Sequence, residues 1–185
     1  MLEPIVQDYI GACTKLSREA FCKQVGVPVL VSRTTRDEQT FQLASTEMQY
    51  SKAGTKPARG KKLDHQLPVL ELRKDSSGPG DQISVGRAEE NDIVIHDETV
   101  SANHAVFMTE AHTGRLLLQD FESTNGTTIN GKLLVPGRAL ELRDGDELSF
   151  GDTVFVFYTP AGLFDELKRM LAPVESVPKP RPKGD

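Results

Sequence analysis

The sequence predicts an all-β domain, a β-sandwich or barrel, over residues 67–160. Short segments of alternating apolar residues recur in this range, and polar turns separate them. One turn is Asn130-Gly131, which tolerates the positive φ angles of a type I′ hairpin, and another is Asp144-Gly145. The range lacks strand–helix–strand spacing, which excludes an open nucleotide-binding α/β sheet. Many short strands joined by such turns are typical of sandwiches and barrels.

Residues 1–50 predict a small α+β appendage that precedes the β domain. Apolar residues at helical spacing indicate a first helix, and they are Leu2, Val6, Ile10 and Cys13. Ser17 is the predicted N-cap of a second short helix that ends at Val25. Residues 27–31 and 39–43 then predict two strands that pair as a hairpin. Such a segment is too short to be stable alone, so we expect it to pack on another part of the chain.

Residues 51–66 predict a basic flexible linker. Its cations stand among Gly, Ala and Pro with hardly any apolar residue, and they are Lys52, Lys56, Arg59, Lys61 and Lys62. This composition is typical of a solvated linker, and a basic contact patch for an acidic partner is the alternative.

The end of the chain predicts one more strand, a helix and a tail. Residues 154–158 carry apolar side chains on both faces, which predicts a central strand. Apolar residues at helical spacing then predict a short C-terminal helix over residues 161–172. Repeated prolines prevent regular structure in residues 173–185, for which we predict a disordered tail.

The charge balance of the chain argues against a general nucleic-acid binder. The chain carries 22 Lys and Arg against 27 Asp and Glu, a net charge of −5, whereas non-specific nucleic-acid affinity comes from cationic side chains. Cys13 and Cys22 lack metal-ligand spacing, so we expect two reduced thiols, no metal and no cofactor. Neither a targeting segment nor an apolar run that could span a bilayer is evident, which favours a cytoplasmic protein without membrane insertion.

The predicted turns carry Arg, Ser, Thr, Asn and Gly in five blocks. In chain order the blocks are Gly86-Arg87, Ser101 to His104, Ser123 to Thr127, Asn130-Gly131, and Asp144-Gly145-Asp146 with Phe150-Gly151. Together they resemble the forkhead-associated (FHA) domain, and the resemblance covers about half of the chain. It implies a β-sandwich of about eleven strands that binds phosphothreonine peptides through loops at one end. The single small FHA unit with short appendages favours a bacterial protein.

Four residues of these blocks are the candidate phosphopeptide-binding residues, namely Arg87, Ser101, Thr124 and Asn125. Phosphothreonine carries about −1.5 to −2 charges and three acceptor oxygens, which suit the planar donor fork of Arg87. The hydroxyls of Ser101 and Thr124 can each donate to a phosphate oxygen. By the resemblance, Ser101 contacts the phosphate directly, Thr124 lies in a phosphate-contacting loop, and Asn125 holds the peptide backbone. Each residue taken alone also fits a surface salt bridge or a turn.

Five further residues are candidates for structural support of the site, namely Gly86, His104, Gly126, Asn130 and Gly131. Gly86 lets the backbone bend so that Arg87 can leave its strand. Asn130 forms a turn with Gly131. By the resemblance, His104 is buried and braces the binding loop by hydrogen bonding.

Ser101 and His104 also invite a catalytic interpretation, in which Asp92 or Asp120 would complete a triad. No strained nucleophile-elbow motif accompanies Ser101. We therefore expect no catalytic residue and no enzyme.

Ala102 departs from the family pattern, because family members often carry Asn, Arg or Lys after the serine. A missing charge-assisted hydrogen bond is worth about 1.5–3 kcal/mol, so we expect a working site of modest affinity, on the order of micromolar. Thr99 is one candidate for reading the residue three after the phosphothreonine, and its uncharged side chain indicates no clear preference.

The sequence thus predicts a module that recruits a partner phosphorylated by an upstream Ser/Thr kinase. The alternative is a phosphorylation-independent scaffold or assembly subunit, in which residues 1–50 make the main contact. Thr34 and Thr35 each precede an acidic residue by three positions. This spacing suggests intramolecular binding of phosphorylated Thr34 or Thr35, and an ordinary polar turn is the alternative interpretation.

Overall fold

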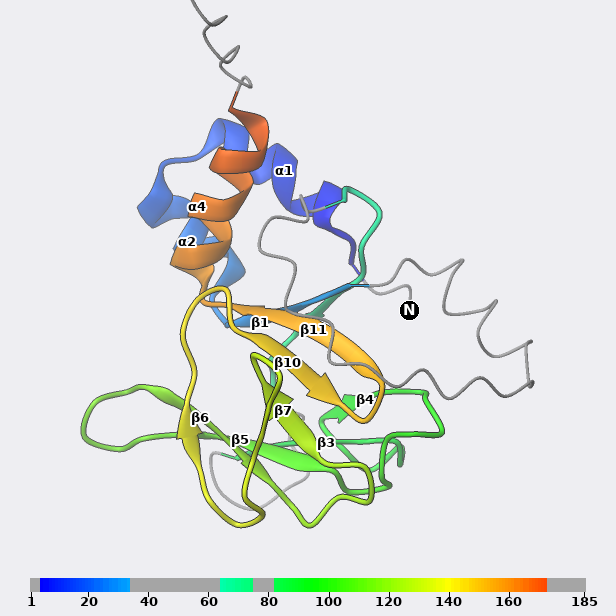
Figure 1. Cartoon of the computed structure of the whole chain (residues 1–185). Helices are drawn as coiled ribbons and strands as arrows, with labels where there is room; N and C mark the ends of the chain where they lie inside the picture. Colours follow the sequence, from blue (N-terminus) through cyan, green and yellow to red (C-terminus); the bar gives the residue numbers. More distant parts are fainter. Residues whose placement is uncertain (1–3, 34–63, 75–81, 173–185) are drawn as a thin grey trace, which may run out of the picture.

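The computed structural model describes residues 4–33, 64–74 and 82–172, and these residues form two packed sheets and a layer of helices (Figure 1). The six-stranded sheet has the order β2-β1-β11-β10-β7-β8, and the five-stranded sheet has the order β4-β3-β5-β6-β9. The strands are β1 Val29–Ser32, β2 Val69–Glu71, β3 Ile83–Gly86, β4 Ile93–Val94, β5 Ala105–Thr109, β6 Leu116–Asp120, β7 Thr127–Ile129, β8 Lys132–Leu133, β9 Leu140–Glu141, β10 Glu147–Phe150 and β11 Thr153–Tyr158. The described residues thus confirm the predicted all-β sandwich.

One hydrophobic core lies between the two sheets. Phe107 of the five-stranded sheet and Phe150 of the six-stranded sheet meet there edge to face, with ring centroids 6.3 Å apart. Alternate residues of the central strands point into this core, among them Leu30 of β1 and Phe155 and Phe157 of β11. The alternation places the intervening residues of both strands on the outer face of the sheet.

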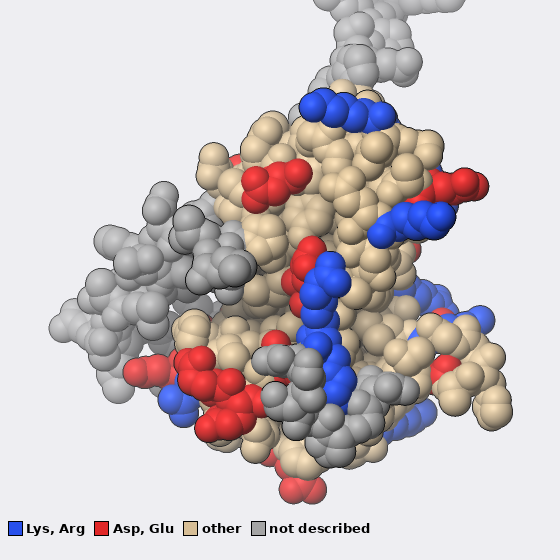
Figure 2. Space-filling model, turned by 180° about the vertical axis from the view of Figure 1, so that it is seen from behind, with Lys and Arg blue, Asp and Glu red and all other residues tan. Residues whose placement is uncertain are grey.

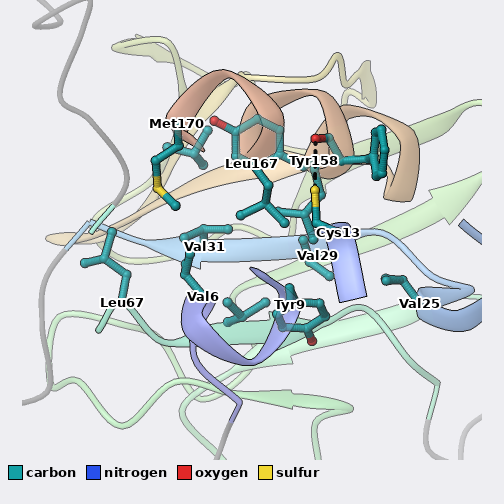
Figure 3. Close-up of a cluster of buried hydrophobic side chains, with 14 of the residues drawn as sticks. Val6, Tyr9, Cys13, Val25, Val29, Val31, Leu67, Tyr158, Leu167 and Met170 are labelled. Atoms are coloured by element: carbon teal, nitrogen blue, oxygen red, sulfur yellow. Dashed lines mark hydrogen bonds between the residues drawn. The ribbon is translucent and has the colours of Figure 1, made fainter. Parts of the chain in front are cut away.

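A second core lies on that outer face, beneath three helices (Figure 3). The helices are α1 Val6–Lys15, α2 Arg18–Val25 and α4 Pro160–Leu171. Val29 and Val31 of β1 contribute to this core together with Tyr158 of β11. β11 therefore has a core on each face and a strand on each edge, which confirms the central strand predicted for residues 154–158.

The N-termini of α2 and α4 carry the capping residues that are usual at helix starts. Ser17 caps α2 by accepting a hydrogen bond from the Ala20 N–H over 3.3 Å, as predicted. α4 begins with Pro160 at its first turn, and the Thr159 hydroxyl accepts from the Gly162 N–H over 3.1 Å. The predicted C-terminal helix is therefore confirmed and starts one residue earlier than expected.

β1 belongs to the sandwich and is not a strand of a separate appendage. It pairs antiparallel with β11 on one edge and with β2 on the other. Its predicted hairpin partner, residues 39–43, lies outside the described residues, and both edges of β1 are already occupied. The predicted linker, apart from residues 64–66, and the predicted tail at residues 173–185 also lie outside them.

Asn130 and Gly131 form the predicted tight turn between β7 and β8. Their φ angles are 52° and 75°, the pair of positive values that a type I′ turn requires.

Leu167→Ala should destabilise the protein strongly. Leu167 is fully buried in the core beneath the helices, and truncating such a leucine costs about 2–5 kcal/mol through lost burial and a residual cavity. Leu171→Ala is the matched control on the same helix, because Leu171 is 40% exposed, and we expect it to cost less than about 1 kcal/mol. Urea unfolding of both variants measures the difference. Equal small losses would show that α4 does not pack on the sheet.

Candidate functional site

Four loops meet at one end of the sandwich, and they carry the candidate binding residues. The Arg87 N–H, just after β3, donates to the Ser101 carbonyl over 2.9 Å. The Thr124 N–H, in the β6–β7 loop, donates to the Ser101 hydroxyl over 2.9 Å. The Gly126 carbonyl of the same loop accepts from the Gly151 N–H, between β10 and β11, over 3.2 Å. The sandwich therefore brings Arg87, Ser101 and Thr124 together.

Gly86 lies where the β3 backbone passes the β4–β5 loop most closely. A Cβ on Gly86 would lie 2.1 Å from the Ala102 carbonyl oxygen, so any side chain there would displace the loop. The buried Asn91 side chain reinforces the approach by donating to the carbonyls of Ala88 and Ala102 over 2.8 and 2.7 Å. Asn91 has no distinguishing signal in the sequence, because a polar residue in a turn can equally well be exposed or buried.

Arg87 holds its guanidinium at the surface with its outer nitrogens available. Its Nε donates to the Val100 carbonyl over 3.2 Å, which fixes the plane of the group. Its two terminal nitrogens have no hydrogen-bond or ion-pair partner among the described residues. An exposed fork with fixed orientation and unused donors is suited to binding an anion.

Ser101 and Thr124 present adjacent hydroxyls. The Ser101 Oγ lies 3.3 Å from the Thr124 Oγ1, to which it donates. Hydroxyl hydrogens rotate freely, so both groups can turn their donors toward a nearby anion at little cost.

Asn125 is exposed, and one of its amide hydrogens is committed to the neighbouring loop. Its Nδ2 donates to the Thr99 carbonyl over 2.7 Å. The Oδ1 and the second N–H remain for another partner. An amide with one free donor and one free acceptor matches the hydrogen-bonding groups of a peptide backbone.

His104 is fully buried and joins two of the loops. Its Nδ1 accepts from the Ser101 N–H over 3.0 Å, so the proton of the neutral ring lies on Nε2, which donates to the Gly126 carbonyl over 3.2 Å. Burial lowers the pKa of His104 below its ordinary value of 6.5, against the opposing effects of the Gly126 carbonyl and the Asp120 charge. Both ring nitrogens bond to backbone groups and neither to the Ser101 hydroxyl, so the geometry does not form the Ser–His pair of a triad.

Asp120 holds the β6–β7 loop from inside the protein and is only 1% exposed. It accepts hydrogen bonds from the Ser123 N–H, the Ser123 hydroxyl and the Thr127 hydroxyl over 3.0, 2.6 and 2.6 Å. Burial would raise the pKa of Asp120, but these hydrogen bonds outweigh it and lower the pKa below its usual range. Asp120 thus remains ionised and keeps the loop folded.

Asn130 and Gly131 lie at the other end of β7 from Asn125. The Asn130 side chain donates to Asp146 over 2.8 Å and accepts from the Glu147 N–H over 3.0 Å. These two residues therefore shape the β7–β8 hairpin and tie it to the start of β10.

No group of three or more His, Cys, Asp or Glu side chains in the described ranges is placed to hold a metal ion. None of the described helices is long and apolar enough to cross a membrane.

The family model of the FHA domain matches residues 83–151. An FHA domain-containing protein of Arabidopsis thaliana is 37% identical over 75 residues, which are 40% of this chain and 19% of that protein. Glycogen accumulation regulator GarA of Mycolicibacterium smegmatis is 38% identical over 76 residues, which cover 41% of this chain and 45% of GarA. The chain therefore spans less than half of these relatives.

Further relatives and solved structures are similar to this chain over about half of its length. The transcriptional regulatory protein EmbR of Mycobacterium tuberculosis is 34% identical over 103 residues, 52% of this chain and 25% of EmbR. The bacterial relatives support the bacterial origin expected from the sequence. The N-terminal FHA domain of Saccharomyces cerevisiae Rad53p, solved with a phosphothreonine peptide, is 26% identical with a TM-score of 0.43, over 51% of this chain and 86% of that one.

The stability of the protein should fall as the pH drops below 6.5, and His104 should account for the fall. The unfolded chain takes up a proton on this histidine near pH 6.5, whereas the folded protein resists protonation until its lower pKa. Between the two values the unfolded state binds more protons, so the free energy of unfolding decreases by up to about 1.4 kcal/mol per pH unit. Urea unfolding between pH 7.5 and about 5 measures this.

A variant of a second, exposed histidine is the control for the assignment of this pH dependence to His104. His104→Gln should remove the dependence near pH 6.5, whereas His96→Gln, whose side chain is 72% exposed, should retain it. A dependence that survives in His104→Gln would assign the titration to another group.

Proposed function

We propose, given that residues 83–151 form an FHA domain, that this chain is a binding module for phosphothreonine segments of other proteins. The observation that supports this most directly is the Arg87 guanidinium, whose terminal nitrogens are free and whose Nε is anchored to the carbonyl of Val100, the residue before Ser101. Such an arrangement offers several donors to one dianionic group.

In this proposal each residue has a separate role. Arg87 pairs with the phosphate through its terminal nitrogens, and Ser101 and Thr124 donate their hydroxyls to other phosphate oxygens. Asn125 uses its free Oδ1 and N–H on the peptide backbone beside the phosphothreonine. His104 contacts no ligand but holds the two loops at the spacing that the other residues need.

The distribution of charge supports a local anion site. On the face shown in Figure 2, the described Lys and Arg side chains stand singly or in short rows among Asp, Glu and uncharged residues. The described residues of that face form no broad cationic surface of the kind that nucleic-acid binding requires. The proposed ligand is accordingly a single phosphorylated segment, and a cytoplasmic Ser/Thr kinase would supply its phosphate.

The chain itself offers one candidate ligand of this kind. Arg33 follows β1 and donates its N–H to the Val154 carbonyl over 2.9 Å. The neighbouring Thr153 hydroxyl bonds to a carboxylate of the β4–β5 loop, so the described chain leaves β1 close to the binding loops. This position supports intramolecular binding of phosphorylated Thr34 or Thr35, which themselves lie outside the described residues.

The second candidate function is that of a scaffold or assembly subunit that binds its partner independently of phosphorylation. Ala102 favours it, because the side chain of this residue contributes no donor to the site. The free terminal nitrogens of Arg87 favour the phosphopeptide module instead. We also propose that the chain has no enzymatic activity of its own, because the Ser101 hydroxyl bonds to Thr124 and the backbone and not to a general base.

Titration of the protein with a degenerate phosphothreonine peptide library tests the proposal. We expect saturable binding, on the order of micromolar, that disappears with the unphosphorylated library. Arg87→Ala should weaken binding by roughly 10- to 150-fold, since hydrogen bonds to charged groups are worth about 1.5–3 kcal/mol.

Arg143→Ala is the matched control for that variant. Arg143 is also exposed, but its loop bonds to the carbonyl of Phe157 near the opposite end of β11, so its loss should leave affinity unchanged. Binding that ignores both the phosphate and Arg87 would favour the scaffold function.

A further inference from the structure

Asp97 joins two of the loops at the binding end. It lies in the β4–β5 loop, where its Oδ1 accepts from the Thr99 N–H over 2.8 Å and from the Thr99 hydroxyl over 2.6 Å. Its Oδ2 accepts from the hydroxyl of Thr153, at the start of β11, over 2.9 Å. One carboxylate thus fixes both its own loop and the adjoining hairpin.

Thr99 passes this constraint to the β6–β7 loop. Its hydroxyl accepts from the Asp152 N–H over 3.0 Å, and its carbonyl accepts from the Asn125 Nδ2 over 2.7 Å. The carbonyl is also in close contact with the β10–β11 turn, because a Cβ on Gly151 would lie 2.5 Å from its oxygen. The Thr99 carbonyl, which accepts from the Asn125 amide, is therefore held in place by contacts on several sides.

The ionised form of Asp97 is the one that can accept all three hydrogen bonds. Burial would raise the pKa of Asp97, but the hydrogen bonds from Thr99 and Thr153 outweigh it and lower the pKa below its usual range. An asparagine at this position would retain one acceptor oxygen and replace the other with a donor, which cannot accept from the Thr153 hydroxyl.

We propose that Asp97 is a positioning residue, which fixes the Thr99 carbonyl and through it the peptide-binding amide of Asn125. This inference rests on the proposed function, which gives Asn125 its role. Asn125 is exposed and lies in a loop, where the free side chain would sample several rotamers. Its bond to Thr99 selects one rotamer in advance, and such pre-organisation increases affinity by reducing the ordering needed on binding.

Two variants with a matched control test the inference. Asp97→Asn should weaken binding of the phosphothreonine peptide selected from the library by about five- to tenfold, because one of its loop hydrogen bonds to a charged group is lost. Thr153→Val should weaken it by about two- to fivefold. Thr128→Val is the matched control. It removes a threonine hydroxyl of β7 that bonds to the Ser149 hydroxyl of β10 over 2.7 Å, and it should leave affinity unchanged.

A double-mutant cycle separates positioning from general loosening of the loops. If Asp97 acts through Asn125, the effect of Asp97→Asn should disappear in an Asn125→Ala background and persist in an Arg87→Ala background. An unchanged affinity of Asp97→Asn, or a full effect in the Asn125→Ala background, would overturn the inference.

A measurement on the free protein keeps this inference distinct from the proposed function. The side-chain amide signal of Asn125 in the NMR spectrum should shift in Asp97→Asn and in Thr153→Val, and it should stay in place in Thr128→Val. An unchanged signal in Asp97→Asn overturns the inference whatever the peptide does. Peptide binding that is unchanged in Arg87→Ala and in Asn125→Ala overturns the proposed function. The role of Asp97 in binding then falls as well.

Discussion

The end of the sandwich that carries the candidate binding loops depends on a buried neutral histidine that connects the two sheets. His104 immediately precedes β5 of the five-stranded sheet, and the Gly126 carbonyl to which it donates immediately precedes β7 of the six-stranded sheet. Its ring also packs edge-on against Phe150 of β10, with centroids 5.7 Å apart. The spacing of the candidate binding loops is therefore tied to the packing of the core, and a change in one alters the other.

Two carboxylates complement the histidine in different ways. Asp120 is buried inside the β6–β7 loop and satisfies that loop's own donors. Asp97 instead spans the β4–β5 loop and the start of β11. Because an uncompensated charge is costly when it is buried, as in Asp120, or half-buried, as in Asp97, each carboxylate stabilises only the loop conformation that supplies its donors. The loops are in this sense specified by electrostatics as much as by turn residues.

Local signals in the sequence predicted most of the sandwich, and long-range contacts account for what they missed. The Asn130-Gly131 turn, the Ser17 cap and the central strand at residues 154–158 follow from neighbouring residues alone. The placement of β1 between β11 and β2 depends on partners far along the chain, which a local pattern cannot identify. The motif blocks at residues 86–87, 101–104 and 123–127 predicted which loops would meet, whereas the roles of Asn91 and Asp97 depend on burial and on partners that only the fold brings near.

The pairing of β1 with β11 has a consequence for the order in which the chain folds. Val29 lies opposite Tyr158, so β1 can take its place beside β11 only after nearly the whole sandwich has been synthesised. Until then α1, α2 and β1 lack the strand and the helix that bury their apolar faces. Contacts between such distant segments slow folding, because the intervening chain must be closed into a loop before they form. The early-synthesised helices would therefore remain exposed to chaperones and proteases for longer than any strand of the five-stranded sheet.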